Sequence, residues 1–262
     1  MIADFLYRRS GLAINYDKLY LLENRLTPML KGHDIEGVKG LAAHMRKNII
    51  STELADAVTE AMTTNETMFF RDQKPFNQLR DIVLPALVEK GVPTIRIWSA
   101  ACSQGQEPYS IAMLLDAERH VLDDIPVHII ATDIAQNILE RAKRGVYTQF
   151  EVQRGLPIKM LMKHFTQCAN AQWQISDAMR DRVQFEYGNL LEEQKPAEPY
   201  HIIMCRNVLI YFDEETREAV LRRIAGVLAK GGYLFLGSSE TILGKSEDFT
   251  AVSGCPGLFT RN

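Results

Sequence analysis

Long apolar runs and paired cysteines are missing from this chain of 262 residues. No apolar run approaches the roughly 20 residues that a membrane-spanning helix needs, and the first residues lack the design of a signal peptide. The four cysteines are widely scattered and include no C-x-x-C pair, so neither a disulfide framework nor a structural zinc site is expected. We therefore expect a reduced, cytoplasmic protein that binds no metal and does not insert into a membrane.

An excess of charge of one sign is missing as well. Lys and Arg total 30, Asp and Glu total 33, and the formal net charge is −3. This balance gives no support to bulk electrostatic binding of nucleic acid. Hydrophobic residues make up 46% of the chain, an ordinary share for a globular protein, and the length allows one large domain or two small ones.

Residues 1–72 have the periodicity of helices and contain no convincing strand. Apolar residues at helical spacing predict one helix that stops at Gly32 and another over 49–62, with Ser51 as its N-cap. Residues 1–50 carry eight Lys or Arg against five Asp or Glu, a local charge of +3. This surplus is either an ordinary solvated helix face or a docking surface for an acidic helical partner.

From residue 75 onward, strand and helix patterns alternate, which predicts a mostly parallel, doubly wound sheet. Strands are expected at 94–100, 126–133, 183–187, 200–205 and 233–237, with an edge strand at 257–260. Helices are expected at 76–89, 107–120, 134–143 and 214–229, the last of them stopped by Gly231 and Gly232. Residues 145–181 are polar and fit this alternation poorly, so we expect an insertion there.

The turn after the first of these strands is the strongest functional signal. Ile95 and Ile97 alternate into a run of small residues, Gly105 follows, and a helix pattern starts at Glu107. Ligands of doubly wound sheets bind beyond the carboxyl end of such a strand, and a glycine permits the tight turn. Only one glycine is present where the dinucleotide motif G-x-G-x-x-G needs three, and the Lys-Ser/Thr ending of a P-loop is missing. We therefore predict a nucleoside-like ligand without a pyrophosphate.

Asp133 ends the second predicted strand, 28 residues after Gly105. An acidic side chain at this place either accepts hydrogen bonds from ribose hydroxyls or caps the following helix. The ligand-binding turn upstream favours the ribose.

The connector 63–72 has neither a helix period nor a strand period. It places polar side chains around Phe69 and Phe70, which we expect to be exposed. The segment is either a rigid hinge between domains or a polar lid over the open edge of the sheet, in which Arg71 is able to hold a carboxylate.

Two further loops follow predicted strands and would line the same crevice. The loop at 205–213 begins with polar groups and then runs apolar, and the loop at 188–191 is a weaker signal. Within the first loop, Asn207 either faces a ligand or satisfies local backbone groups, and Tyr211 either faces a ligand or belongs to the core.

Taken together, these segments resemble the CheR-type chemoreceptor methyltransferases of bacteria. The motifs that carry the resemblance lie in order along nearly the whole chain, at 63–72, 98–110, 131–134, 189–191, 205–213 and 231–240. The resemblance implies an α/β fold: a Rossmann-like class I S-adenosylmethionine-dependent methyltransferase domain, with an N-terminal all-helical domain and a small inserted β-subdomain. We expect the helical domain and its linker at 1–72, the methyltransferase domain at 73–262 and the inserted subdomain at 145–181.

The resemblance also implies the site residues. The cofactor S-adenosylmethionine would be held by Asn65, Thr67 and Arg71 at its methionine end, Glu107 in the first turn, Asp133 at the ribose, Asn189 and Leu190 at the adenine, and Arg206 and Asn207 near the sulfonium. Arg71 and Tyr211 would position the target carboxylate beside the methyl group. Lys18 and Arg25, one heptad apart, would face the acidic helices of the receptor.

The implied reaction transfers a methyl group from S-adenosylmethionine to glutamate side chains of chemoreceptors, giving glutamyl methyl esters and S-adenosylhomocysteine. Glutamate is ionised at neutral pH and the sulfonium carries its own activated methyl group, so no His-centred constellation is needed. The implied partner is the cytoplasmic helical domain of the receptor, which would recruit a monomeric enzyme to membrane receptor arrays.

Two departures from the family pattern affect these expectations. Gln106 stands where the family motif usually has a glutamate, while Glu107 remains, so we expect little effect on catalysis. Family members that dock on a C-terminal receptor pentapeptide tend to have a glycine-rich loop in the inserted subdomain, and residues 166–173 contain no glycine. We therefore expect methylation without pentapeptide tethering.

Two other functions compete with this interpretation. A nucleic-acid or small-molecule methyltransferase could use the same sheet, but base-amino methylation sites usually have an Asn/Asp-Pro-Pro-Tyr/Phe loop where this chain has 206–209, and the net charge argues against nucleic acid. A non-catalytic, cofactor-binding adaptor is the second alternative. The complete set of predicted site residues argues against it.

Overall fold

The computed structural model describes residues 1–14, 19–122, 124–242 and 246–262. Its N-terminal part is built from helices. In the described residues up to 62 these are α1 (Ile2–Ser10), α2 (Tyr20–Lys31), α3 (Gly37–Arg46) and α4 (Thr52–Met62). Their apolar faces form a separate hydrophobic core. The predicted cap of α4 is confirmed, because the Ser51 hydroxyl accepts a hydrogen bond from the N–H of Leu54 at 3.2 Å.

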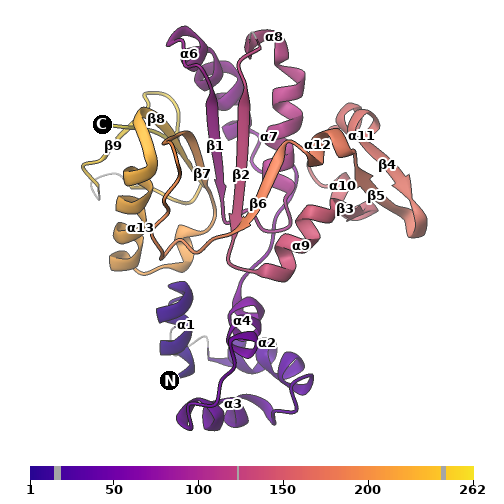
Figure 1. The fold of residues 1–262 in the computed structure, drawn as a ribbon, viewed down its shortest axis with the longest axis vertical. Helices are drawn as coiled ribbons and strands as arrows, with labels where there is room; N and C mark the ends of the chain where they lie inside the picture. The colour runs from indigo at the N-terminus through magenta and orange to yellow at the C-terminus, as the bar shows by residue number, and fades with distance from the viewer. Residues whose placement is uncertain (15–18, 123, 243–245) are drawn as a thin grey trace.

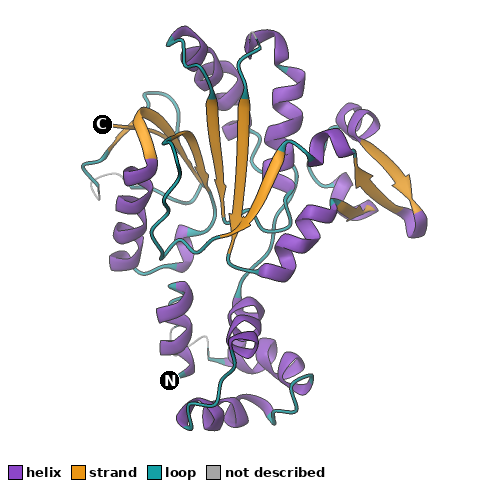
Figure 2. Ribbon diagram, viewed as in Figure 1, coloured by secondary structure: helices purple, strands orange, loops and turns teal. Residues whose placement is uncertain are grey.

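The rest of the chain is organised around a mixed sheet with the strand order β6-β2-β1-β7-β8-β10-β9 (Figures 1 and 2). Its strands are β1 (Ile95–Ala100), β2 (Val127–Asp133), β6 (Val183–Tyr187), β7 (Tyr200–Cys205), β8 (Leu228–Leu236), β9 (Phe249–Ala251) and β10 (Leu258–Arg261). The five strands from β6 to β8 run parallel, and β10 and β9 continue the sheet antiparallel. The predicted parallel sheet is confirmed, whereas β9 has no counterpart among the predicted strands.

One prediction about this sheet is wrong: Gly231 and Gly232 do not separate a helix from a strand. They lie inside β8, which begins at Leu228, and the pairing of β8 with β7 shifts register between Tyr200 and Ile202. Gly231 adopts a φ of +68°, and a Cβ on Gly232 would approach the carbonyl oxygen of Ala229 to 2.8 Å. The glycines therefore permit a bulge in a strand rather than ending a helix.

Helices cover both faces of the sheet, and each face has its own core. They are α5 (Lys74–Gln78), α6 (Leu84–Glu89), α7 (Gln106–Ala117), α8 (Arg119–Leu122), α9 (Gln136–Arg144) and α13 (Glu214–Val227). Neighbouring residues of one strand, such as Ile97 and Trp98, enter different cores, as expected for a sheet covered on both sides. A π-helical turn (Leu79–Val83) joins α5 to α6 and interrupts the helix predicted at 76–89. No helix in the described ranges is long and apolar enough to cross a membrane.

A small second sheet lies beside the main one, within the predicted insertion at 145–181 (Figure 1). It consists of β3 (Val146–Thr148), β4 (Phe165–Cys168) and β5 (Gln172–Ile175), paired antiparallel in the order β3-β5-β4. The helices α10 (Gln149–Gln153), α11 (Ile158–His164) and α12 (Asp177–Arg180) accompany it, and a 3-10 turn (Ala169–Ala171) joins β4 to β5.

Candidate active site

A cavity opens at the carboxyl ends of β1, β2 and β7, the place where ligands bind in sheets of this kind. It contains about 1060 Å³ of empty space, including the part open to solvent. All ten residues predicted to bind the cofactor or the target carboxylate line it: Asn65, Thr67, Arg71, Glu107, Asp133, Asn189, Leu190, Arg206, Asn207 and Tyr211. The chain thus brings together residues from five separate segments of the sequence.

The turn after β1 uses more left-handed residues than its single glycine indicates. Ala101, Ser103 and Gly105 have φ values of 54°, 52° and 89°. Positive φ is costly for residues with a Cβ, and such positions persist where the surrounding structure imposes them, often at functional sites. The turn aims the backbone N–H of Ser103 at the Oδ2 of Asp133, 2.8 Å away.

Asp133 is held at the cavity by the backbone on both sides. Its Oδ2 accepts from Ser103, and its Oδ1 accepts from the N–H of Ala135 at 3.0 Å, next to the start of α9. Both meanings predicted for this residue are therefore compatible, because the carboxylate lies at a helix start and also lines the cavity. The side chain is only 6% exposed, and this burial raises the pKa of the carboxyl group above its ordinary value.

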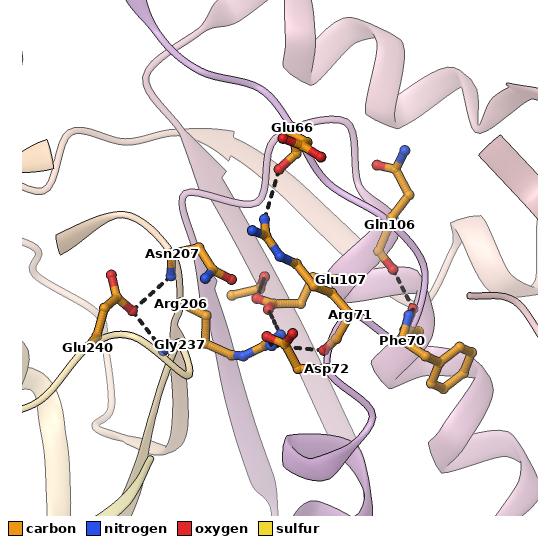
Figure 3. Close-up of polar contacts among 12 residues, drawn as sticks. Glu66, Phe70, Arg71, Asp72, Gln106, Glu107, Arg206, Asn207, Gly237 and Glu240 are labelled. Carbon is orange, nitrogen blue, oxygen red and sulfur yellow. Dashed lines mark hydrogen bonds and ion pairs between the residues drawn. The ribbon is translucent and has the colours of Figure 1, made fainter. Parts of the chain in front are cut away.

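An ionic network centred on a buried arginine fixes the end of the lid, by which we mean residues 63–72. Arg206 forms ion pairs with Glu107 at 2.8 Å and with Asp72 at 2.9 Å, and it donates to the carbonyl oxygen of Arg71 at 2.8 Å (Figure 3). The Arg206 side chain is 1% exposed. Glu107 accepts a second hydrogen bond from the Ser99 hydroxyl at 2.8 Å. Arg206 lines the cavity as predicted, but its charge is balanced by carboxylates of the chain itself.

The lid is ordered by hydrogen bonds along its length. The Ser103 hydroxyl donates to the carbonyl oxygen of Asn65 at 3.1 Å, and the N–H of Phe70 donates to the Ser110 hydroxyl at 2.9 Å. Arg71 donates to the carbonyl oxygen of Glu66 at 3.0 Å (Figure 3). The lid is thus a fixed wall of the cavity, with its polar side chains on the cavity side.

The expectation that Phe69 and Phe70 are exposed is wrong. Phe69 is fully buried and Phe70 is 7% exposed. The Phe69 ring makes edge contacts with Tyr147 and Phe165, at centroid distances of 4.9 and 5.6 Å. Tyr147 and Phe165 both belong to the segment 145–181, so Phe69 anchors the lid to that segment. These partners lie some 80 to 100 residues away along the chain, and a local sequence pattern cannot reveal them.

Glu240 supports a loop that lines the cavity, a role that the sequence analysis did not assign although the residue ends the motif 231–240. Its carboxylate accepts short hydrogen bonds from the backbone N–H groups of Gly237 and Asn207, at 2.7 and 2.8 Å (Figure 3). The N–H of Val208 donates to it as well, at 2.9 Å. Asn207 has a φ of 59°, so the loop that carries it needs an external support. In the sequence this role is indicated only by Ser-Ser-Glu after a glycine that ends a strand. That pattern does not reveal which backbone N–H groups donate to the glutamate.

We expect Glu240→Gln to lower the free energy of unfolding by about 2 kcal/mol, because the glutamine amide presents N–H groups to backbone N–H groups and removes the charge from these hydrogen bonds. Urea unfolding followed by circular dichroism measures the change. Glu247→Gln, at an exposed glutamate, is the matched control and should leave stability unchanged. Equal stability of the two variants would contradict the role assigned to Glu240.

The remaining predicted residues lie at the cavity in different environments. Asn189 donates from its amide to the carbonyl oxygen of Arg9 at 2.8 Å and accepts from the N–H of Leu191 at 3.0 Å, so its side chain is engaged within the chain. Leu190 adds an apolar surface beside it. Tyr211 is half-buried, packs against the core under α13 and also lines the cavity.

The N-terminal helix α1 contributes a wall that the sequence analysis did not foresee. Ser10 and Leu12 line the cavity at the end of this helix. The N–H of Ala13 donates to the carbonyl oxygen of Tyr211 at 3.2 Å, which ties the segment to the far end of the chain. Contacts across about 200 positions leave no local pattern in a sequence, so no prediction was possible.

The two residues predicted to dock the substrate have different outcomes. Lys18 lies outside the described residues. Arg25 directs its guanidinium to its own chain, donating to the carbonyl oxygens of Met62 and Thr63, each at 2.9 Å, and to the Thr64 hydroxyl at 3.2 Å. No cluster of three or more potential metal ligands occurs in the described part of the chain.

The chemistry of the cavity fits a nucleoside that carries no phosphates. A buried, oriented carboxylate is present for a ribose diol, and Leu190 and Ile134 offer apolar surface for a base. Arg206 is neutralised by its ion pairs with Glu107 and Asp72, so it offers no free positive charge to a phosphate group. The lid supplies amide and hydroxyl groups for a polar tail.

Comparisons with known proteins agree with this geometry. The family profile described as "CheR methyltransferase, SAM binding domain" matches residues 65–257, and the one described as "CheR methyltransferase, all-alpha domain" matches residues 1–63. The chain is 39% identical to chemotaxis protein methyltransferase 1 of Pseudomonas aeruginosa, covering 98% of this chain and 94% of that protein. It is 36% identical to chemotaxis protein methyltransferase Cher2 of Pseudomonas putida, covering 97% and 94%. A chemotaxis protein methyltransferase of Vibrio parahaemolyticus is 37% identical, covering 97% and 92%.

Proposed function

The chain belongs to the CheR methyltransferase family, and from this membership and its site we propose that it methylates glutamate side chains of chemoreceptors. It is an S-adenosylmethionine-dependent methyltransferase with an all-helical N-terminal domain. The observation that carries the proposal is the convergence of ten predicted residues on one cavity at the carboxyl ends of the central strands. The products would be glutamyl methyl esters and S-adenosylhomocysteine.

The residues at the cavity fit the cofactor. When bound, S-adenosylmethionine supplies an activated methyl group on its sulfonium. We assign the ribose to Asp133, the adenine to Asn189 and Leu190, and the methionine end to the lid residues Asn65, Thr67 and Arg71 together with Glu107. Arg206 and Asn207 form the floor, where Arg206 holds the lid through Asp72 and so keeps water out of the site.

The target carboxylate needs orientation rather than activation. A glutamate is ionised at neutral pH, so the protein does not have to remove a proton before transfer. What remains is alignment at contact distance and exclusion of water. Arg71 keeps guanidinium N–H groups beyond the one bonded to Glu66, and Tyr211 lies half-buried at the same cavity. We assign the positioning of the carboxylate to these two side chains.

We expect Arg71→Ala to reduce the rate of methyl transfer about 100-fold at saturating cofactor, because the target carboxylate loses its charged hydrogen-bond donor. Steady-state assays with receptor-enriched membranes measure the rate. Arg80→Ala is the matched control, since this exposed arginine pairs with Asp81 outside the cavity. An unchanged turnover number in Arg71→Ala would remove Arg71 from the mechanism.

The wider organisation follows from the same proposal. We propose a helical domain with its linker at 1–72, a methyltransferase domain at 73–262 and an inserted subdomain at 145–181.

Receptor helices would dock on the basic N-terminal helices, with Lys18 as a contact. Charge reversal at Lys18 should then weaken receptor methylation. The glycine-free stretch 166–173 supports methylation without a pentapeptide tether. Removal of the last five residues of the receptor should therefore leave the rate of receptor methylation unchanged.

Transfer of labelled methyl groups tests the proposed function directly. Purified protein, S-adenosylmethionine labelled in its methyl group and receptor-enriched membranes are incubated together, and the membranes are then treated with mild base. Release of labelled methanol indicates glutamyl methyl esters. Label that resists base would indicate amide or amine methylation, and an absence of transfer would indicate a cofactor-binding adaptor. Receptors whose methyl-accepting glutamates are changed to alanine are the control.

A further inference from the structure

We infer that Arg25 is a positioning residue that fixes the start of the cofactor lid from within the N-terminal helical domain. Arg25 lies on α2, yet its three hydrogen bonds go to Met62, Thr63 and Thr64, where α4 ends and the lid begins. The inference rests on the S-adenosylmethionine site and not on the identity of the methyl acceptor. It gives Arg25 a role other than receptor docking.

The Arg25 guanidinium binds the carbonyl oxygens at the end of α4 that lie beyond Glu60, whose own carbonyl oxygen accepts from the N–H and the hydroxyl of Thr63. The last carbonyl oxygens of a helix have no partner within the helix, and they carry a partial negative charge. Thr63 adopts an extended conformation, with φ −68° and ψ 153°, instead of the left-handed glycine that often closes a helix. The Arg25 guanidinium donates to the carbonyl oxygens of both Met62 and Thr63 at 2.9 Å and so fixes the direction in which the chain leaves α4.

That direction sets the position of the lid. The Asn65 amide donates to the Thr63 hydroxyl at 3.1 Å, so the residue held by Arg25 in turn holds a residue that lines the cavity. At the other end of the lid, Arg206 binds Asp72 and the carbonyl oxygen of Arg71. The lid is therefore fixed at both ends by an arginine, one from the helical domain and one from the sheet.

Holding both ends reduces the conformational freedom that the lid would lose when the cofactor binds. A site that is ordered before binding retains more of its interaction energy as affinity. Loss of Arg25 should therefore weaken cofactor binding although the side chain is not among the residues that line the cavity. A docking role predicts the opposite pattern, with weaker use of the receptor and an unchanged affinity for the cofactor.

Titration calorimetry with S-adenosylhomocysteine, in the absence of any receptor, separates these roles. We expect Arg25→Met to raise the Kd about tenfold, because hydrogen bonds from a charged group to two carbonyl oxygens are lost. Arg25→Lys should give a smaller increase, because an ammonium keeps the charge but lacks the planar fork that reaches all three acceptors. Lys31→Met removes an exposed charge from the same helix and should leave the Kd unchanged.

A second measurement distinguishes positioning from a general loss of stability. Amide hydrogen exchange of residues 63–72 should be faster in Arg25→Met, while exchange in the central strands stays as in the parent protein. An unchanged Kd in Arg25→Met would overturn the inference, and so would an equal change in Lys31→Met. Should Arg25→Met fail to fold, Arg25→Lys carries the test by the same two criteria. Failure of receptor methylation would not affect this outcome, because no receptor is present.

Discussion

Replacing Arg206 by methionine is expected to abolish measurable binding of S-adenosylhomocysteine and to lower the free energy of unfolding by about 3 to 5 kcal/mol. The guanidinium is almost completely buried between Glu107 and Asp72. Without it, the largely buried carboxylate of Glu107 and the more exposed carboxylate of Asp72 lose their shared cation, and the lid loses the donor to the carbonyl oxygen of Arg71. The same change thus removes a stabilising charge and releases one end of the lid.

Urea unfolding and calorimetry on the same variants check both parts of this expectation. Arg222→Met, at an exposed arginine of α13, is the matched control and should behave as the parent protein. Arg206→Lys should fall between, because a lysine keeps the charge but cannot bind two carboxylates and a carbonyl oxygen with one planar group. Normal binding by Arg206→Met would show that the ionic network does not hold the cofactor site.

Asp133→Asn is expected to weaken S-adenosylhomocysteine binding about 100-fold while the protein stays folded. The carboxylate uses one lone pair of each oxygen for the N–H groups of Ser103 and Ala135, and further lone pairs remain for ribose hydroxyls. The asparagine amide has one oxygen instead of two and presents its NH₂ to a backbone N–H group. Loss of hydrogen bonds to a charged group costs about 1.5 to 3 kcal/mol each, which accounts for a change of this size.

The pH dependence of binding adds an independent check of Asp133. Burial raises its pKa, so in the free protein the carboxylate takes up a proton at a higher pH than an ordinary aspartate does. Affinity should therefore be full above this raised pKa and fall as the pH drops through it. Asp133→Asn should lack this dependence, and Asp181→Asn, at an exposed aspartate, should retain both affinity and dependence. Parent-level affinity in Asp133→Asn would exclude the ribose assignment.

The parts of the fold that local sequence determines were predictable. Short apolar runs located β1, β2, β6 and β7, and the polar residues that end these strands converge because parallel strands present their carboxyl ends at one edge. The turn at Gly105 and Asp133 follow from this rule, whereas the lid is indicated by its lack of either a helix or a strand period. The family resemblance then supplied roles that residue patterns alone left open.

The parts that depend on distant contacts were not predictable. The sequence predicts a helix stop at Gly231 and Gly232, whereas their role in a strand bulge depends on the pairing of β8 with β7. Glu240 binds backbone groups some 30 residues away, and Arg25 binds carbonyl groups nearly 40 residues away. Such interactions leave no periodic pattern in the sequence, because they join a single side chain to backbone groups, and every residue has a backbone.

A crystal structure of the protein with S-adenosylhomocysteine is the most direct test of the proposed active site. We expect the ligand in the cavity between the lid and the strand ends, with its ribose hydroxyls bonded to the carboxylate of Asp133 and its amino-acid end beneath residues 65–71. A ligand bound at another place, or bound here with Asp133 turned away from the ribose, would contradict the assignment of this cavity as the methyl-donor site.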